Sequence, residues 1–111
     1  MTVIIDYGVG NLYSLAGSLR FIGEEASVSR DPDVISSADR IILPGVGAFG
    51  DAYGKLSSSG LIPVIKAYKG PILGICLGMQ LLFEKSYEYG CHEGLGLIPG
   101  EVRPLADDIS L

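Results

Sequence analysis

Cys76 lies in a pattern that could support nucleophilic chemistry. Glycines stand two residues to either side of it, at Gly74 and Gly78. A short apolar run ends at Gly74, and apolar residues with the spacing of one helix face follow the cysteine, which predicts a sharp strand-to-helix turn. Such a turn projects the side chain off the strand, and free N–H groups at the helix start favour a thiolate and an oxyanion. The pattern predicts Cys76 as a nucleophile and the Leu77 N–H as an oxyanion donor; the alternative is a small buried cysteine filling the corner.

A second glycine-rich stretch, residues 44–50, follows an apolar run. Glycines leave backbone N–H groups bare, so those of Val46, Gly47 or Ala48 are expected opposite the Leu77 N–H, completing an oxyanion hole. A plain tight turn is the alternative. The glycine spacing also matches a dinucleotide-binding fingerprint, which needs an acidic residue about 20 positions later. Residues 52–83 contain no Asp or Glu, so no cofactor is expected.

The chain has one histidine, His92, which directly follows Cys91. A cysteine hydrolase needs a base, commonly histidine, beside its nucleophile. Sequence alone does not bring His92 to Cys76, and a solvent-exposed loop histidine is the default interpretation, with Cys91 incidental. Two cysteines and one histidine lack the spacing of a metal site, so no metal is expected.

The candidate site residues must be positioned by helices and strands. Along the chain, strand patterns alternate with helical patterns. The pattern predicts an α/β fold, an open and mostly parallel sheet with helices on both faces. Turns at Gly10, Gly47 and Cys76 all follow strands, so three loops are expected to converge on one crevice with Cys76 at its floor. The expected strands span 3–5, 25–29 (weak, at an edge), 40–43, 72–74 and part of 97–105; the expected helices span 12–22 (capped by Asn11), 32–35, 51–56, 61–68 and 77 to about 84, with a loop over 87–96.

Composition limits the partners. The 111 residues suit one domain, and a hydrophobic content of 48% fits strands buried on both faces. A net charge of −5 argues against nucleic acid or an anionic membrane as partner. Few cysteines, no signal peptide and no apolar run of membrane-spanning length predict a cytoplasmic protein. Asp107 and Asp108 are expected to form a solvated acidic tail.

Three motifs in order, Tyr7–Asn11, Pro44–Gly50 and Gly74–Leu82, resemble those of the triad (class I) glutamine amidotransferases, in particular the glutaminases that serve histidine biosynthesis. The resemblance runs from Met1 to about residue 105. It implies a flavodoxin-like fold, truncated at the C-terminus, with residues 1–111 as the N-terminal part of one amidotransferase domain.

The resemblance also implies roles. Cys76 would attack the side-chain amide of glutamine and form a glutamyl thioester, with the Leu77 N–H and an N–H of the Val46–Gly47 loop holding the oxyanion. Gln80 would help to hold glutamine, with Gly47 at the rim. Asn11 would face a cyclase (synthase) subunit that forms a heterodimer with the glutaminase and receives its ammonia.

The family's catalytic histidine and glutamate come later than the residues present here. The chain alone is therefore expected to turn over glutamine poorly, since a positioned acid–base group typically contributes ~10²–10⁴-fold. A non-catalytic binding module and another elbow-cysteine hydrolase are the alternatives. A sheet left with an open edge or an uncovered apolar face would favour self-association.

Overall fold

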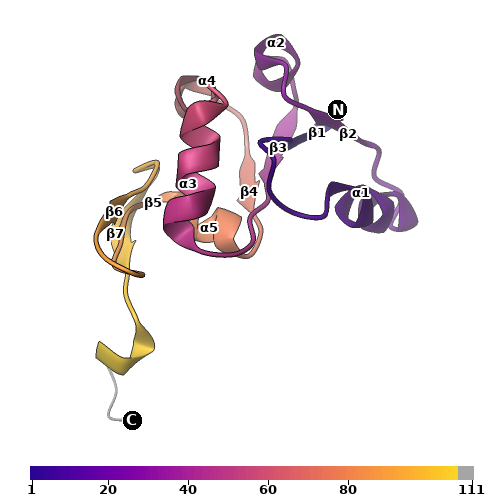
Figure 1. Cartoon of the computed structure of the whole chain (residues 1–111). Helices are drawn as coiled ribbons and strands as arrows, with labels where there is room; N and C mark the ends of the chain where they lie inside the picture. The colour runs from indigo at the N-terminus through magenta and orange to yellow at the C-terminus, as the bar shows by residue number, and fades with distance from the viewer. Residues whose placement is uncertain (108–111) are drawn as a thin grey trace.

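The computed structural model describes residues 1–107, and its main element is a four-stranded parallel sheet (Figure 1). The strand order is β2-β1-β3-β4, which is the flavodoxin-like order. The central strand predicted over 3–5 and the edge strand predicted over 25–29 are both confirmed. The strands are β1 (Thr2–Ile5), β2 (Ala26–Ser29), β3 (Arg40–Leu43) and β4 (Ile72–Gly74).

Local signals set the starts of the first two helices. Asn11 caps α1 (Leu12–Phe21) by accepting a hydrogen bond from the Ser14 N–H at 3.1 Å. Asp31 caps α2 (Pro32–Ser36) in the same way, with proline at the first helical position. The later helices are α3 (Phe49–Ser58), α4 (Ile62–Ala67) and α5 (Leu77–Leu81).

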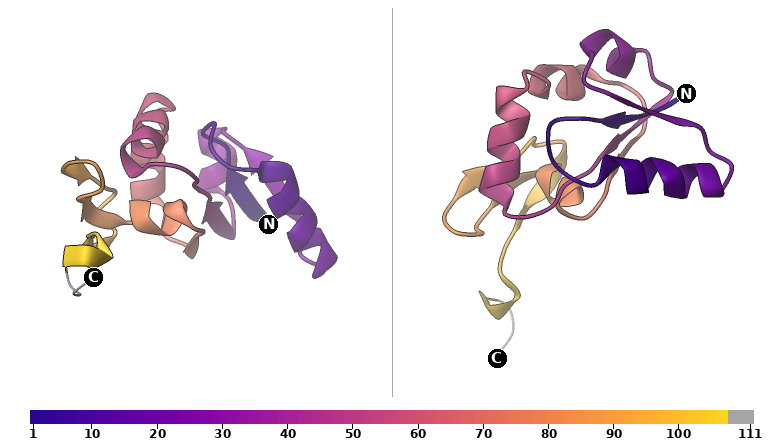
Figure 2. Two further views of the ribbon diagram at one scale, coloured as in Figure 1. Left: turned by 60° about the horizontal axis from the view of Figure 1, so that its bottom comes forward. Right: turned by 45° about the vertical axis from the view of Figure 1, so that its right-hand side comes forward.

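Helices lie on both faces of the sheet, as predicted, but they cover the faces unequally. The core lies on the face that carries Val3 and Ile5, where α2, α3, α4 and α5 contribute buried side chains. Helix α1 lies on the opposite side, apart from α3 and α4 in all three views (Figures 1 and 2). It buries no side chain completely. Within the part of the chain that the structure describes, one helix therefore covers the second face.

A second, three-stranded sheet follows α5 and corrects the prediction. The helix expected to about residue 84 ends at Leu81, and the expected loop over 87–96 contains a strand. The cause is pairing with distant residues: Phe83 pairs with Ile98 in parallel. These long-range bonds override the local helical pattern. The sheet has the order β6-β5-β7, from β5 (Phe83–Ser86), β6 (His92–Glu93) and β7 (Ile98–Val102).

The strand expected within 97–105 is confirmed as β7 despite Pro99, because β7 lies at a sheet edge where a missing N–H is tolerated. A short 3₁₀ turn, Leu105–Asp107, ends the described chain. The acidic tail expected at Asp107 and Asp108 lies largely beyond this point, since Asp108 is outside the described residues. None of the helices described over residues 1–107 has the length and apolar character to cross a bilayer.

Candidate active site

Cys76 lies at a sharp turn between β4 and α5, as the sequence predicts. Its backbone has φ 54° and ψ −124°, a conformation that side chains rarely adopt and that only glycine enters freely. Its side chain is exposed and forms no disulfide. The interpretation as a buried space-filling cysteine is therefore wrong. The expected position at the floor of a crevice is also wrong, since Cys76 is exposed at the surface of the turn.

The flanking glycines are required by close packing rather than by unusual dihedral angles. A Cβ on Gly74 would lie 2.5 Å from the Met79 Cα, and one on Gly78 would collide with the Leu43 carbonyl oxygen. Since Leu43 ends β3, the first turn of α5 lies directly against the neighbouring strand. The turn at Cys76 closes as tightly as it does because neither glycine has a side chain.

The glycine-rich loop after β3 packs directly against this turn. A Cβ on Gly45 would lie 2.5 Å from the Gly78 backbone nitrogen. The Gly78 N–H donates a hydrogen bond to the Ile75 carbonyl. The Leu77 N–H, the predicted oxyanion donor, is not the donor of that bond. The structure thus packs Gly45, the residue before the Val46–Gly47 stretch, against the start of α5. A shared oxyanion hole stays a prediction.

The loop after β1 joins the same edge of the sheet. A Cβ on Gly10 would touch the Pro44 side chain at 3.4 Å, and the Tyr7 hydroxyl donates to the Pro44 carbonyl. Burial raises the pKa of Tyr7 to about 12. The convergence of the three loops is confirmed. A cavity of about 250 Å³ spans two of them without including Cys76; it is lined by Gly8, Val9, Gly10, Val46, Gly47, Ala48, Asp51, Ala52 and Lys55.

Gln80 lies one turn into α5 with its side chain half-buried. Its Oε1 atom is buried and, within the described chain, has no hydrogen-bond partner. It lines a cavity of about 200 Å³ together with Glu88, Val102, Arg103 and Pro104. A buried acceptor without a donor is unfavourable by about 1–3 kcal/mol, so this oxygen suits a ligand that donates an N–H.

Asn11 is exposed at the start of α1, where its side chain accepts the Ser14 N–H. The structure thus gives it a local role as a helix cap. Whether it also faces a partner stays a prediction.

His92 does not interact with Cys76. It lies in β6, with its Nε2 3.2 Å from the Tyr89 carbonyl oxygen and its ring 6.4 Å from the Phe49 ring. A Cβ on Gly50 would lie 2.8 Å from the His92 ring, so the histidine packs on the first turn of α3. It is half-buried rather than the solvent-exposed loop residue expected by default. Cys91 is exposed.

Sequence reasoning missed Glu88. Its Oε1 atom accepts the Phe49 N–H at 2.9 Å, at the start of α3, where the N-cap residue Ala48 provides no side-chain bond. The two residues are 39 positions apart, and no local pattern connects them.

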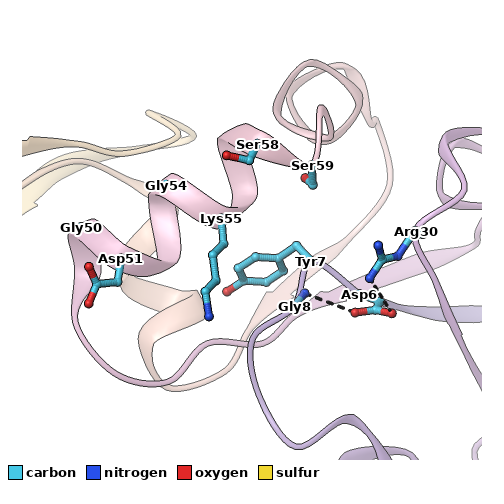
Figure 3. Close-up of a pocket in the computed structure, with 10 residues that line it drawn as sticks. All are labelled: Asp6, Tyr7, Gly8, Arg30, Gly50, Asp51, Gly54, Lys55, Ser58 and Ser59. Carbon is cyan, nitrogen blue, oxygen red and sulfur yellow. Dashed lines mark hydrogen bonds and ion pairs between the residues drawn. The ribbon is translucent and has the colours of Figure 1, made fainter.

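A larger hollow of about 840 Å³ opens between the end of β1 and α3 (Figure 3). Arg30 forms an ion pair with Asp6 at 3.3 Å, and Lys55 extends from α3 beside the Tyr7 ring. The hollow carries both charge signs and no cysteine or histidine. It is lined by Asp6, Tyr7, Gly8, Arg30, Gly50, Asp51, Gly54, Lys55, Ser58 and Ser59. Among residues 1–107, no three His, Cys, Asp or Glu side chains are grouped as a metal would require.

The parallel sheet in flavodoxin-like order and the cysteine elbow at its edge define a class of protein, and comparison with known families agrees. The model of the family "Glutamine amidotransferase class-I" matches residues 3–95. The chain belongs to this family, which confirms the resemblance found from its motifs.

Individual relatives are more specific. The chain is similar to the imidazole glycerol phosphate synthase subunit HisH of Aquifex aeolicus, with 57% identity over 105 residues, which is 91% of this chain and 51% of the relative. The same subunit of Wolinella succinogenes is 50% identical over 107 residues, 94% of this chain and 52% of the relative. That of Lacticaseibacillus casei is 48% identical over 114 residues, all of this chain and 55% of the relative. The chain spans about half the length of these curated relatives.

Proposed function

We propose that this chain provides the nucleophile-bearing half of a glutaminase, the glutamine amidotransferase subunit of an imidazole glycerol phosphate synthase in histidine biosynthesis. One observation carries the proposal: an exposed cysteine held at φ 54° between a parallel strand and a helix, inside the span matched by the amidotransferase family. Residues 1–111 are then the N-terminal part of one amidotransferase domain, active in the cytoplasm.

The chemistry begins with the thiolate of Cys76. Its sulfur attacks the side-chain amide carbon of glutamine, and the carbonyl oxygen becomes an oxyanion. The Leu77 N–H and an N–H of Val46 or Gly47 stabilise that charge, a contribution typically worth ~10²–10³-fold for each donor. An acid–base group then protonates the departing nitrogen, the C–N bond breaks, ammonia leaves, and a glutamyl thioester remains. Water hydrolyses the thioester, releasing glutamate and restoring the thiol.

Gln80 and Gly47 are the proposed contacts to bound glutamine. The unpartnered Oε1 atom of Gln80 supports this role, because the α-ammonium group of an amino acid is the kind of donor that it lacks. Gly47 is exposed and has φ 83°, a conformation that suits glycine. Because glycine has no side chain, nothing obstructs the loop beside the substrate at this position.

The proton transfers need an acid–base group that the described residues do not bring to Cys76. His92 packs on α3 and has no hydrogen bond with the cysteine. We therefore expect the histidine and glutamate of the triad from the half of the domain that the relatives have in addition. The chain alone should turn over glutamine ~10²–10⁴-fold more slowly than a complete subunit.

The ammonia released is proposed to pass to a cyclase (synthase) subunit paired with the glutaminase in a heterodimer. This rests on the names of the relatives and on the place of Asn11, exposed at the edge of the sheet where the three loops meet. No contact with nucleic acid, a membrane, a metal or a cofactor is part of the proposal.

The test is covalent capture by an electrophilic glutamine analogue, 6-diazo-5-oxo-norleucine, read by mass spectrometry of the intact chain and its peptides. Cys91 is the internal control, because it is also an exposed free thiol. The expected result is one adduct, at Cys76, that disappears in Cys76→Ala, persists in Cys91→Ala and is competed by glutamine. Equal labelling of both cysteines, or no effect of glutamine, would contradict the proposal.

A non-catalytic binding module is the second candidate, favoured by the lack of an acid–base partner for Cys76 among residues 1–107. It predicts that glutamine protects the chain from labelling or unfolding while no thioester forms. Trapping with hydroxylamine distinguishes the two, since a thioester yields the glutamyl hydroxamate and simple binding does not. Hydrolysis abolished by His92→Ala would instead make His92 the base.

A further inference from the structure

Tyr7 is a buried tyrosine whose hydroxyl bonds to the start of the glycine-rich loop after β3. It follows β1, is 4% exposed and belongs to the core cluster. Its hydroxyl donates to the Pro44 carbonyl, 37 positions further along the chain. A phenylalanine would fill the same space without burying a hydroxyl, which is unfavourable unless the hydroxyl finds a partner. The bond to Pro44 is therefore the feature of Tyr7 that core packing alone does not explain.

The turn that carries Tyr7 is itself held in place. One oxygen of the Asp6 carboxylate accepts the Gly8 N–H at 3.2 Å, and the other pairs with Arg30 at 3.3 Å. A carboxylate that bonds the backbone two residues on restrains the residue between them. Figure 3 shows Tyr7 reaching from this turn toward α3. The hydroxyl is thus presented to Pro44 from a restrained position.

The loop after β3 has little steric reason to hold one conformation. Gly45 and Gly47 flank Val46, and glycine enters backbone conformations that are closed to other residues, as Gly47 does with φ 83°. Val46 and Gly47 are exposed, whereas Pro44 is buried. An oxyanion donor is effective when its N–H direction is set before the reaction. The exposed stretch must therefore be oriented by contacts made at its buried start.

We propose that Tyr7 is a positioning residue for the oxyanion donors of the glutaminase reaction and acts through the peptide group between Pro44 and Gly45. That group is planar, so the bond to its oxygen also sets the direction of the Gly45 N–H. Gly45 packs against the Gly78 nitrogen, so the peptide is held between the loop after β1 and the turn at Cys76. This role rests on the proposed function and includes no contact between Tyr7 and glutamine.

The test is the inactivation of Tyr7→Phe by 6-diazo-5-oxo-norleucine, with the adduct at Cys76 quantified by mass spectrometry. The rate constant at saturation reports stabilisation of the reacting carbonyl, and the half-saturating concentration reports binding of the analogue. Loss of the hydroxyl should lower the rate constant about 10–10²-fold and change the half-saturating concentration less than about twofold, because a slightly misplaced donor loses most of its effect on the reacting group.

Tyr68→Phe is the matched control. The Tyr68 hydroxyl also donates to a main-chain carbonyl, that of Ala38, at 2.8 Å. Ala38 precedes β3 whereas Pro44 follows it, so the same substitution is made at the opposite end of the same strand. Tyr68→Phe should leave both kinetic constants unchanged. Urea unfolding of both variants checks that each is folded under the conditions of the assay.

NMR provides a second readout that needs no reaction. The Val46 and Gly47 amide signals should shift or broaden in Tyr7→Phe and stay unchanged in Tyr68→Phe. In the wild type, the buried Tyr7 hydroxyl proton should exchange slowly enough with water to give a signal of its own.

Four results would overturn the proposal: an unchanged rate constant in Tyr7→Phe, an equal loss in Tyr68→Phe, unchanged loop amides in Tyr7→Phe, or no hydroxyl signal from Tyr7 in the wild type. Failure of the proposed function is distinguishable from all of these. It would be seen as a wild-type chain that the analogue does not label at Cys76, before any variant is compared.

Discussion

Replacing Cys76 by glycine should make the chain more stable while removing its nucleophile. With φ 54° and ψ −124°, Cys76 holds a conformation that costs a side-chain-bearing residue of the order of 1–3 kcal/mol. Glycine enters it without that cost. Cys76→Ala is the proper reference, because alanine also removes the sulfur but keeps the Cβ and therefore the strain.

The expected difference follows from two opposing terms. Relief of strain favours the glycine variant by about 1–3 kcal/mol, and the greater freedom of glycine in the unfolded chain opposes it by about 0.4–1 kcal/mol. The side chain is exposed, so little packing is lost. The net expectation is that Cys76→Gly is more stable than Cys76→Ala by roughly 0.5–2 kcal/mol. A difference of about 1 kcal/mol corresponds to roughly 4–8 °C in Tm for a domain of this size.

The assay is urea unfolding followed by circular dichroism at 222 nm, with thermal melts in parallel. Cys91 provides the control pair, because it is exposed and its φ is not positive. There the glycine variant should be less stable than the alanine variant. A Cys76→Gly chain no more stable than Cys76→Ala, or the same sign of difference at both cysteines, would refute the argument that the turn is strained.

Three further predictions follow from buried contacts. Burial raises the pKa of Tyr7 from 10.0 to about 12. The neutral phenol therefore stabilises the fold below pH 10, and this contribution is lost as the pH rises toward 12. In urea titrations, the free energy of unfolding of the wild type relative to Tyr7→Phe should fall by about 2–3 kcal/mol between pH 10 and pH 12. Gly78→Ala should lower stability by about 3 kcal/mol or more in the same titrations, because the added methyl would meet the Leu43 carbonyl. Glu88→Ala should cost about 1 kcal/mol and speed hydrogen exchange at the Phe49 amide, measured by NMR, because it removes the bond that caps α3.

Features encoded by neighbouring residues could be predicted from the sequence. Asn11 before a helical pattern, Pro32 after Asp31 and the glycines around Cys76 each specify a local geometry, and each element starts where expected. Strands β1, β3 and β4 followed from their apolar runs, whereas β2, with the sequence Ala-Ser-Val-Ser, is the weak prediction. The convergence of their loops followed from topology, since the carboxyl ends of parallel strands meet at one edge.

Features that depend on distant residues could not be predicted. The predicted helix runs to about residue 84, yet residues 83–86 form a strand because Ile98 and Val102 lie beside them. The contact between Glu88 and Phe49 spans 39 positions, and the packing of His92 on Gly50 spans a comparable distance. Sequence periodicity gives no information on such pairs, because they depend on how finished elements pack together.

The proposed chemistry at Cys76 depends on β4. This strand has three residues and, among residues 1–107, pairs with β3 alone, yet the chain passes from it within two residues into the strained turn at Cys76. On its core side the turn is held by close glycine contacts with β3 and the loop after it. On its other side Leu73 is exposed. The strained turn at Cys76 is therefore held by contacts on the core side of the sheet.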